Sequence, residues 1–130
     1  MAGFDPDALI LLAHGSPDPL WILPAEATAE RVRGLVPREC PVVLAVLEHG
    51  KALAEAVRDL RDAGHRRIVI LPLFLSAGGR HVRRDVPAMV LALQQTFKSV
   101  ALHLVPGALG TDDAVLDALA EAAVRHARLA

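Results

Sequence analysis

Residues 8–16 read ALILLAHGS, an unbroken apolar run that stops abruptly at His14-Gly15-Ser16. A continuous apolar run without polar alternation is typical of a strand that is buried on both faces of a sheet. Two further runs of this kind follow, VVLAVL at 42–47 and IVILPL at 68–73, and a weaker run covers 100–105. We therefore expect four strands, three of them buried on both faces.

Apolar residues at helical spacing separate these runs. After the second run, Leu53, Ala56, Val57 and Leu60 recur at i, i+3, i+4 and i+7, and Gly64 is placed to end that helix. Similar patterns predict helices over 24–36, over 86–97, and from the capping sequence at 111–113 to about residue 125. Four strand–helix units with short connections predict a single doubly wound α/β domain over 1–130, a four-stranded parallel sheet with helices on both faces.

Composition narrows the classes of function. Of the 130 residues, 53% are hydrophobic and 3% are aromatic, and the formal net charge is −1. We therefore expect no nucleic-acid partner, since neither a strong positive field nor a base-stacking surface is present. No run approaches the roughly 20 apolar residues of a membrane span, and the N-terminus lacks the basic start of a signal peptide. With a single cysteine, Cys40, the sequence favours a cytoplasmic protein without membrane contact.

The predicted strand ends nominate a functional edge, because open parallel sheets bind ligands outside the carboxyl ends of their strands. Of the six histidines, three follow a predicted strand and three lie elsewhere: His14, His49 and His81 against His65, His103 and His126. Two imidazoles from different loops, together with a carboxylate such as Glu48, can bind a divalent metal and leave coordination positions open. The alternative is that His14 and His81 only hydrogen-bond loop carbonyls, and that His49 is a surface residue.

The loop after the third strand combines small and basic residues: Ser76, Gly78, Gly79, Arg80, Arg83 and Arg84. Small residues allow a bulky flat ligand to approach the backbone. Three guanidinium groups beside a helix N-terminus favour a ligand with several carboxylates or phosphates. The alternative for the small residues is a turn that needs positive φ. The alternative for the arginines is a solvated helix start.

These residues also carry a resemblance to a known family. HGS at 14–16, Leu47-Glu48 after the second strand and PLFLSAGGRHVRRDVP at 72–87 resemble, in order and spacing, the short CbiX-type sirohydrochlorin chelatases. The chain departs from the family pattern at Pro17, where a basic residue is usual. It departs again at 49–52, where a proline-containing segment is usual.

The resemblance implies ATP-independent insertion of a divalent metal, Co²⁺, Fe²⁺ or Ni²⁺, into sirohydrochlorin or a related tetrapyrrole for cobalamin or siroheme biosynthesis. It implies His14 and His81 as the catalytic, metal-binding pair, Glu48 as a further metal ligand, and a homodimer without an organic cofactor. Ser16 and the small and basic residues of the third loop would contact the substrate. Leu73, Leu75 and Leu109 would cover a face of the macrocycle.

Three alternatives stay open. The same site can hold a metal or a tetrapyrrole as a non-catalytic carrier. His14 can be the nucleophile of a phosphate-ester enzyme with the arginines as an anion clamp, although Ala13 stands where such enzymes carry arginine. An apolar face can make the chain a plain interaction domain.

Overall fold

The computed structural model describes residues 5–76, 78, 79 and 81–128, with His81 and Val82 described by their backbone alone. Its strands and longer helices are β1 (Ala8–Ala13), α1 (Leu23–Arg33), β2 (Val42–Val46), α2 (Leu53–Asp62), β3 (Arg67–Pro72), α3 (Val86–Thr96), β4 (Ala101–Leu104) and α4 (Asp113–Arg128). A π-helical turn, His81–Asp85, precedes α3, and a 3-10 turn, Leu109–Thr111, precedes α4. The predicted alternation of strands and helices is confirmed.

All four strands are parallel and lie in the order β2-β1-β3-β4. Strand β1 has apolar neighbours on both faces, since Ile10 and Leu12 belong to one core cluster and Leu11 to another. This double burial explains why its sequence is continuously apolar rather than alternating. Strand β3 ends at Pro72, which has no N–H to donate to a neighbouring strand.

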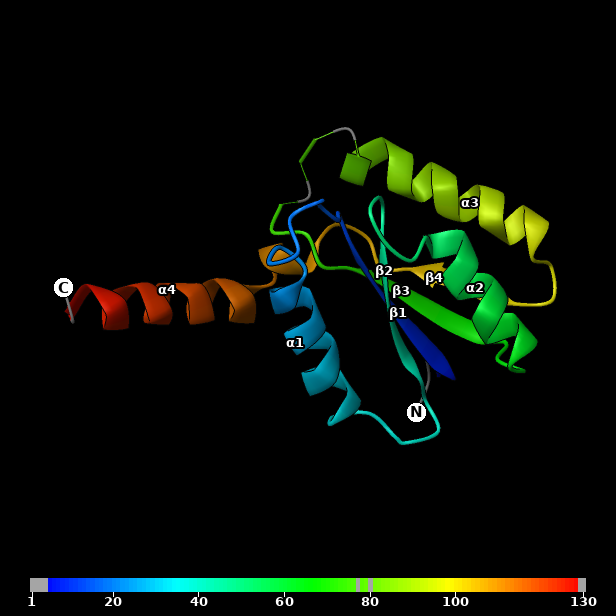
Figure 1. Ribbon diagram of the computed structural model, residues 1–130, viewed down its shortest axis with the longest axis horizontal. Helices are drawn as coiled ribbons and strands as arrows, with labels where there is room; N and C mark the ends of the chain where they lie inside the picture. The colour runs from blue at the N-terminus through cyan, green and yellow to red at the C-terminus, as the bar shows by residue number, and fades with distance from the viewer. Residues whose placement is uncertain (1–4, 77, 80, 129–130) are drawn as a thin grey trace.

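Helices lie on both faces of the sheet, as predicted (Figure 1). Helices α2 and α3 cover one face, where Val57 and Val86 join the larger core cluster. Helix α1 covers the β1–β2 half of the other face, where Ala29 packs with Leu11 and Val42. Helix α4 packs on neither face and extends away from the body, a position that the sequence pattern did not predict. Within the described residues, no helix is both long enough and apolar enough to cross a membrane.

Two helix ends follow the capping residues that the sequence nominates. Gly64 lies beyond the end of α2 with a φ of +99°, and the N–H of His65 donates to the C=O of Leu60 at 3.0 Å. At the start of α4, the carboxylate of Asp112 accepts a hydrogen bond from the N–H of Ala114 at 2.9 Å. A side-chain cap therefore satisfies one of the free N–H groups at the start of α4.

Candidate functional site

The strand order creates a switch point between β1 and β3. The chain leaves β1 toward α1 and β2 on one side, and it leaves β3 toward α3 and β4 on the other. The carboxyl ends of these neighbouring strands are where open α/β sheets bind ligands. His14 follows β1 and the buried Phe74 follows β3, and their ring centroids lie 4.3 Å apart across this point.

The turn after β1 is tied to the turn after β2. The N–H groups of Leu47 and Glu48 both donate to the backbone C=O of His14, each at 3.1 Å. Gly15 has a φ of +92°, and a Cβ built on it would collide with the backbone C=O of Glu48. Only a residue without a side chain allows this approach. The two turns therefore hold His14 and Glu48 at one point of the sheet edge.

A cavity of about 300 Å³ opens beside His14, between these two turns and the start of α3. Its lining combines one imidazole, two carboxylates and three apolar side chains: His14, Glu48, Asp85, Leu47, Val86 and Met89. His14 is half-buried and Glu48 is exposed. Carboxylates attract a divalent cation, and a neutral imidazole can bind a metal or accept a proton. The arrangement suits chemistry that brings a cation and an ionisable N–H group together.

Asp85 was not among the predicted site residues, and the structure brings it to the His14 cavity. It is the last residue of the π-helical turn His81–Asp85, and it directly precedes α3. Such turns are rare and recur at functional sites, because one extra residue re-aims the side chains around it. Local periodicity carries no signal for this turn. The cue in the sequence was the place of Asp85 within the stretch at 72–87 that carries the family resemblance.

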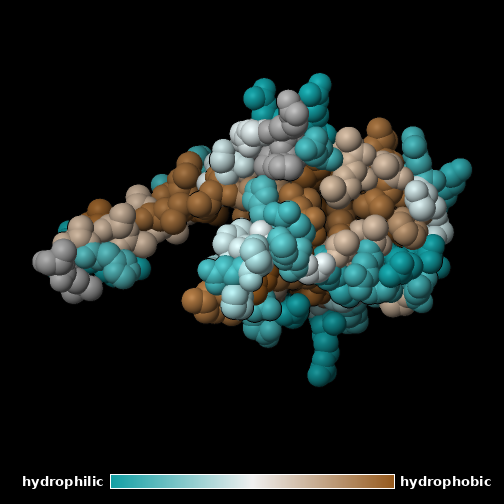
Figure 2. All heavy atoms as spheres, turned by 45° about the horizontal axis from the view of Figure 1, so that its top comes forward, coloured by the Kyte–Doolittle hydropathy of each residue, from teal (hydrophilic) through white to brown (hydrophobic). Residues whose placement is uncertain are grey.

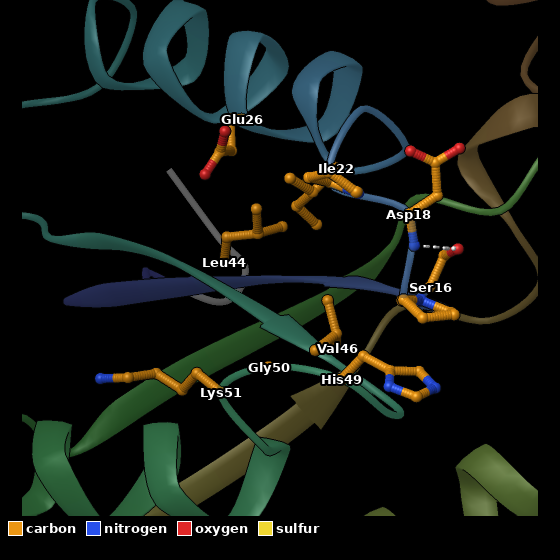
Figure 3. A pocket seen from close by; sticks show the side chains of 12 residues that line it. Ser16, Asp18, Ile22, Glu26, Leu44, Val46, His49, Gly50 and Lys51 are labelled. Carbon is orange, nitrogen blue, oxygen red and sulfur yellow. Dashed lines mark hydrogen bonds between the residues drawn. The ribbon is translucent and has the colours of Figure 1, made fainter.

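Two predicted residues lie in a different cavity. Ser16 and His49 line a hollow of about 680 Å³ between the β1 and β2 ends and α1, together with Asp18, Glu26 and Lys51 (Figure 3). The Ser16 hydroxyl accepts a hydrogen bond from the N–H of Asp18 at 3.1 Å. His49 is exposed and has a positive φ of 61°. The end of β1 therefore divides the predicted residues, with His14 on one side and Ser16 and His49 on the other.

The loop after β3 brings basic residues to the neighbourhood of His14. Arg83 lines a cavity of about 480 Å³ that shares Val86 with the His14 cavity, and Arg84 is exposed beside it in sequence. The N–H of Arg83 donates to the C=O of Gly79, whose φ of +87° turns the chain into the π-helical turn. Arg80 lies outside the described residues.

Among the described small and aliphatic residues that were predicted to contact the substrate, none lines the His14 cavity. The exposed Ser76 and Gly78 are linked, because the Ser76 hydroxyl accepts the N–H of Gly78 at 3.0 Å. Leu73 and Leu75 line a groove on the α1 side, away from the His14 cavity. Leu109 is half-buried in the turn before α4. Leu73 and Leu75 thus share a surface with α1 rather than with His14.

The predicted metal ligands are His14, His81 and Glu48, and the side chain of His81 is not among those that the structure describes. Within the described residues, no three His, Cys, Asp or Glu side chains form a group that could hold a metal ion. The backbone of His81 starts the π-helical turn that ends at Asp85 in the His14 cavity, but its side chain is not among those described. The approach of His81 to His14 stays a prediction.

The model of the CbiX family matches residues 8–126. A sirohydrochlorin cobaltochelatase from Methanopyrus kandleri (strain AV19) is 34% identical over 83 residues, which make up 64% of this chain and 57% of the relative. The match thus spans little more than half the length of that curated relative.

Solved structures share the fold. A crystal structure from Marinobacter aquaeolei VT8, assigned as a CbiX protein of cobalamin (vitamin B12) biosynthesis, is 29% identical with a TM-score of 0.81, covering 95% of this chain and 97% of that chain. The sirohydrochlorin chelatase SirB from Bacillus subtilis subspecies spizizenii, in complex with cobalt, is 20% identical with a TM-score of 0.67, covering 76% of this chain and 42% of that chain. SirB from Bacillus subtilis with Fe³⁺ is also 20% identical, with a TM-score of 0.64, and the match covers 75% of this chain and 38% of that chain. At 20% identity, the SirB structures support the fold alone.

Proposed function

Because the chain belongs to the CbiX family, we propose that it inserts a divalent metal ion into sirohydrochlorin or a related tetrapyrrole without ATP. The candidate ions are Co²⁺ and Fe²⁺, with Ni²⁺ as a third. The proposed product serves cobalamin or siroheme biosynthesis. The observation that carries this proposal is the placement of His14 at the β1–β3 switch point, in one cavity with Glu48 and Asp85. Metal insertion needs a group that accepts protons from the ring and groups that hold the ion while it loses water. An imidazole can do the first, and two carboxylates can do the second.

Insertion releases two protons, because the two pyrrole N–H groups lose them when their nitrogens bind the ion. A neutral imidazole can take up one such proton and pass it to water, and we assign this role to His14. The ion must also shed its water shell before the ring nitrogens replace it. Glu48 and Asp85, which line the same cavity, would attract the ion and hold it while water leaves.

His81 would be the second imidazole, and the arginines would position the substrate. We propose that His81, from the loop after β3, contacts the metal together with His14 and takes up the second proton. Sirohydrochlorin carries several carboxylates on its rim, and guanidinium groups bind carboxylates in a fixed geometry. Arg83 lines the cavity next to His14, so it is the described arginine that we expect to bind a rim carboxylate. Arg80, Arg84 and the small residues of this loop complete the proposed substrate contact.

The proposed function is tested by anaerobic incubation with sirohydrochlorin and Co²⁺, Fe²⁺ or Ni²⁺ in parallel, with visible absorbance reporting the metallated ring. We expect His14→Ala to lower the insertion rate by about 100-fold or more, as for loss of a proton acceptor. His49→Ala is the matched control, since His49 follows β2 but lines the cavity on the other side of β1. We expect that variant to retain most of the activity.

Two results would overturn the proposal. One is a His14→Ala chain that inserts metal at the wild-type rate. The other is a wild-type chain that shifts the absorbance of sirohydrochlorin on binding and retains Co²⁺ in equilibrium dialysis, yet never forms the metallated ring. That second result would assign the chain as a carrier.

We also propose that the chain acts as a homodimer. Similarity to short CbiX-type proteins, which pair through facing clefts, supports this part of the proposal. It is independent of which metal is inserted.

A further inference from the structure

The imidazole of His14 packs against a buried phenylalanine. The ring centroids of His14 and Phe74 lie 4.3 Å apart, and the two ring planes meet at 37°. Phe74 is 5% exposed and belongs to the larger core cluster, whereas His14 is half-buried beside its cavity. A half-buried side chain next to a cavity can occupy more than one rotamer, and a fixed ring against it restricts that choice. Phe74 is therefore placed to set the orientation of the imidazole.

The backbone around Phe74 is held from two sides. On one side, the N–H of Leu73 donates to the C=O of Leu12 at 2.8 Å, which continues the pairing of β3 with β1. On the other side, the C=O of Phe74 accepts the N–H of Gly110 at 2.9 Å. Gly110 is buried, and a Cβ built on it would collide with the backbone of Leu75. The start of the loop after β3 is therefore fixed between β1 and the turn that carries Gly110.

This turn, residues 108–111, is called the Gly110 turn below, and it is attached to the core. It follows β4, and Ala108 at its start belongs to the larger core cluster. The C=O of Ala108 accepts the N–H of Thr111 at 3.1 Å and the hydroxyl of the same residue at 2.7 Å. Helix α4 projects from the turn as an arm, and apolar atoms continue from the helix onto the body where the two join (Figure 2). The Gly110 turn thus braces the start of the β3 loop against the core.

The main chain of His14 is fixed by a different pair of contacts. Its C=O accepts the N–H groups of Leu47 and Glu48, each at 3.1 Å. The turn after β2 therefore holds the backbone of His14, while Phe74 meets its ring. A reacting group that is oriented before the substrate arrives accelerates a reaction, and a misplacement of about 1 Å can cost roughly 100-fold in rate. Contacts that fix both the backbone and the ring of His14 match this requirement.

We propose that Phe74, braced by the Gly110 turn, is the positioning residue that holds the His14 imidazole for metal insertion. The inference rests on the proposed role of His14 as proton acceptor. It adds to the site two segments outside the lining of the His14 cavity, the start of the β3 loop and the Gly110 turn. When His14 takes the proton of a pyrrole N–H, the same contact stabilises the imidazolium, because an aromatic ring attracts a cation within about 6 Å of its centroid. Phe74 acts through His14 and is not itself a catalytic residue.

Steady-state kinetics of metal insertion test the role of Phe74. In Phe74→Leu, an apolar side chain still fills the core but no flat ring meets His14. We expect kcat to fall about tenfold or more and the KM for sirohydrochlorin to change less than about twofold, because the substrate contacts stay in place. Phe97→Leu is the matched control. Phe97 packs against the same core cluster but follows the end of α3, whereas the start of α3 borders the His14 cavity. Wild-type kcat for Phe74→Leu, or an equal fall for Phe97→Leu, would overturn the proposal.

Proton NMR of His14 gives a readout that does not require activity. In the wild type, we expect nuclear Overhauser effects between the ring protons of His14 and Phe74, since the two centroids lie 4.3 Å apart. The imidazole resonances are assigned by their loss in His14→Gln. They should move in Phe74→Leu, which lacks the ring current of the phenyl group, and stay in place in Phe97→Leu. Absence of these effects in the wild type would overturn the proposal without any variant having to fold.

Gly110→Ala tests the brace. The added methyl group must push the Leu75 backbone away, so we expect the His14 resonances to move and kcat to fall by about threefold or more, with KM changed less than about twofold. Gly34→Ala is the matched control, since neither glycine has a positive φ. A Cβ on Gly34 would make an ordinary contact at 3.5 Å with the C=O of Arg31. A Gly110→Ala chain with wild-type kcat and unmoved His14 resonances would overturn the role of the turn.

The inference and the proposed function fail separately. A wild type that forms no metallated ring would refute metal insertion, whatever the His14 resonances show. A wild type that inserts metal but shows no contact between the rings of His14 and Phe74, or whose kcat is unchanged by Phe74→Leu, would refute the positioning role alone.

Discussion

His14 and Ser16 are two residues apart, yet they line different cavities. The residue between them decides this separation. Gly15 turns the chain at positive φ and rests against the Glu48 carbonyl, so the chain crosses the end of β1 from one side to the other. The HGS motif can therefore be understood as an imidazole, a turn that needs glycine, and a hydroxyl that organises the next loop through Asp18.

We expect Gly15→Ala to reduce both stability and activity. Positive φ costs an alanine about 1–2 kcal/mol, and the collision with the Glu48 carbonyl must displace one of the two turns. Gly64→Ala is the matched control, because Gly64 has a similar φ of +99° and its Cβ would meet no described atom within 4 Å. Urea unfolding should show the larger loss for Gly15→Ala, and only that variant should lose metal insertion. Equal losses of stability would show that the contact with Glu48 is unimportant.

Cys40 is the residue for which the structure predicts a pH effect. Burial, and to a lesser extent the charge of Asp7, raise the pKa of the Cys40 thiol above its usual range. At pH values where the thiol begins to ionise in the unfolded chain, the native chain still holds it protonated. The free energy of unfolding therefore falls as the pH rises from the unfolded pKa toward the native pKa of Cys40. At pH 8, alkylation by iodoacetamide should be slower in the native chain than in urea. Asp7→Asn should raise the alkylation rate of the native chain by only the smaller part of its difference from the rate in urea. A native rate equal to the rate in urea would contradict the dominance of burial.

At the scale of elements, β4 depends on α3 for its position. β4 has four residues and pairs with β3 alone, so it is an edge strand. The half-buried Gln94 of α3 donates from its amide to the C=O of Val100 at 2.7 Å and accepts the N–H of Leu102 at 2.8 Å. One side chain thus satisfies backbone groups on both sides of the strand's first residue.

We expect Gln94→Ala to destabilise the chain by roughly 1–3 kcal/mol, because half-buried backbone groups would lose their partners. The neighbouring Gln95 is exposed, and Gln95→Ala should change the free energy of unfolding by no more than about 0.5 kcal/mol. Hydrogen exchange localises the effect, since the Leu102 amide should exchange faster only in Gln94→Ala. Unchanged exchange at Leu102 would show that β4 is held by β3 alone.

The elements themselves were largely predictable, because their causes are local. Continuous apolar runs placed the first three strands within about one residue of their observed ends, and Pro72 marked the end of β3 as expected. The π-helical turn before α3 was not predictable, since no residue pattern specifies an extra residue per turn. Asp85 was missed for the same reason. The division of Ser16 from His14 was also missed, because it depends on the contact between Gly15 and a carbonyl from another strand.

At the scale of the whole molecule, the core and the arm are energetically separate. Both core clusters consist of residues between Ala8 and Ala108, and α4 contributes to neither. An amphipathic pattern predicted a helix from 113 onward, and it equally predicts packing against its own sheet. Periodicity specifies that a face needs a partner but not which chain supplies it. In the structure α4 leaves the body at the turn around Gly110, and the close approach of Gly110 to the Leu75 backbone has no signal in the local sequence.

A chain that ends at residue 112 separates folding from association. Because α4 contributes no buried residue, the shortened chain should unfold cooperatively, and its urea midpoint should not depend on chain concentration. The full chain, if it is the proposed homodimer, should behave differently, since unfolding of a dimer also releases two chains. Its stability should rise by about 1.4 kcal/mol of dimer for each tenfold rise in concentration. Urea titrations of both chains over a hundredfold concentration range would measure this contrast. A concentration-independent midpoint for the full chain would place its stability in the single copy, and a shortened chain that fails to fold would show that α4 contributes to its own core.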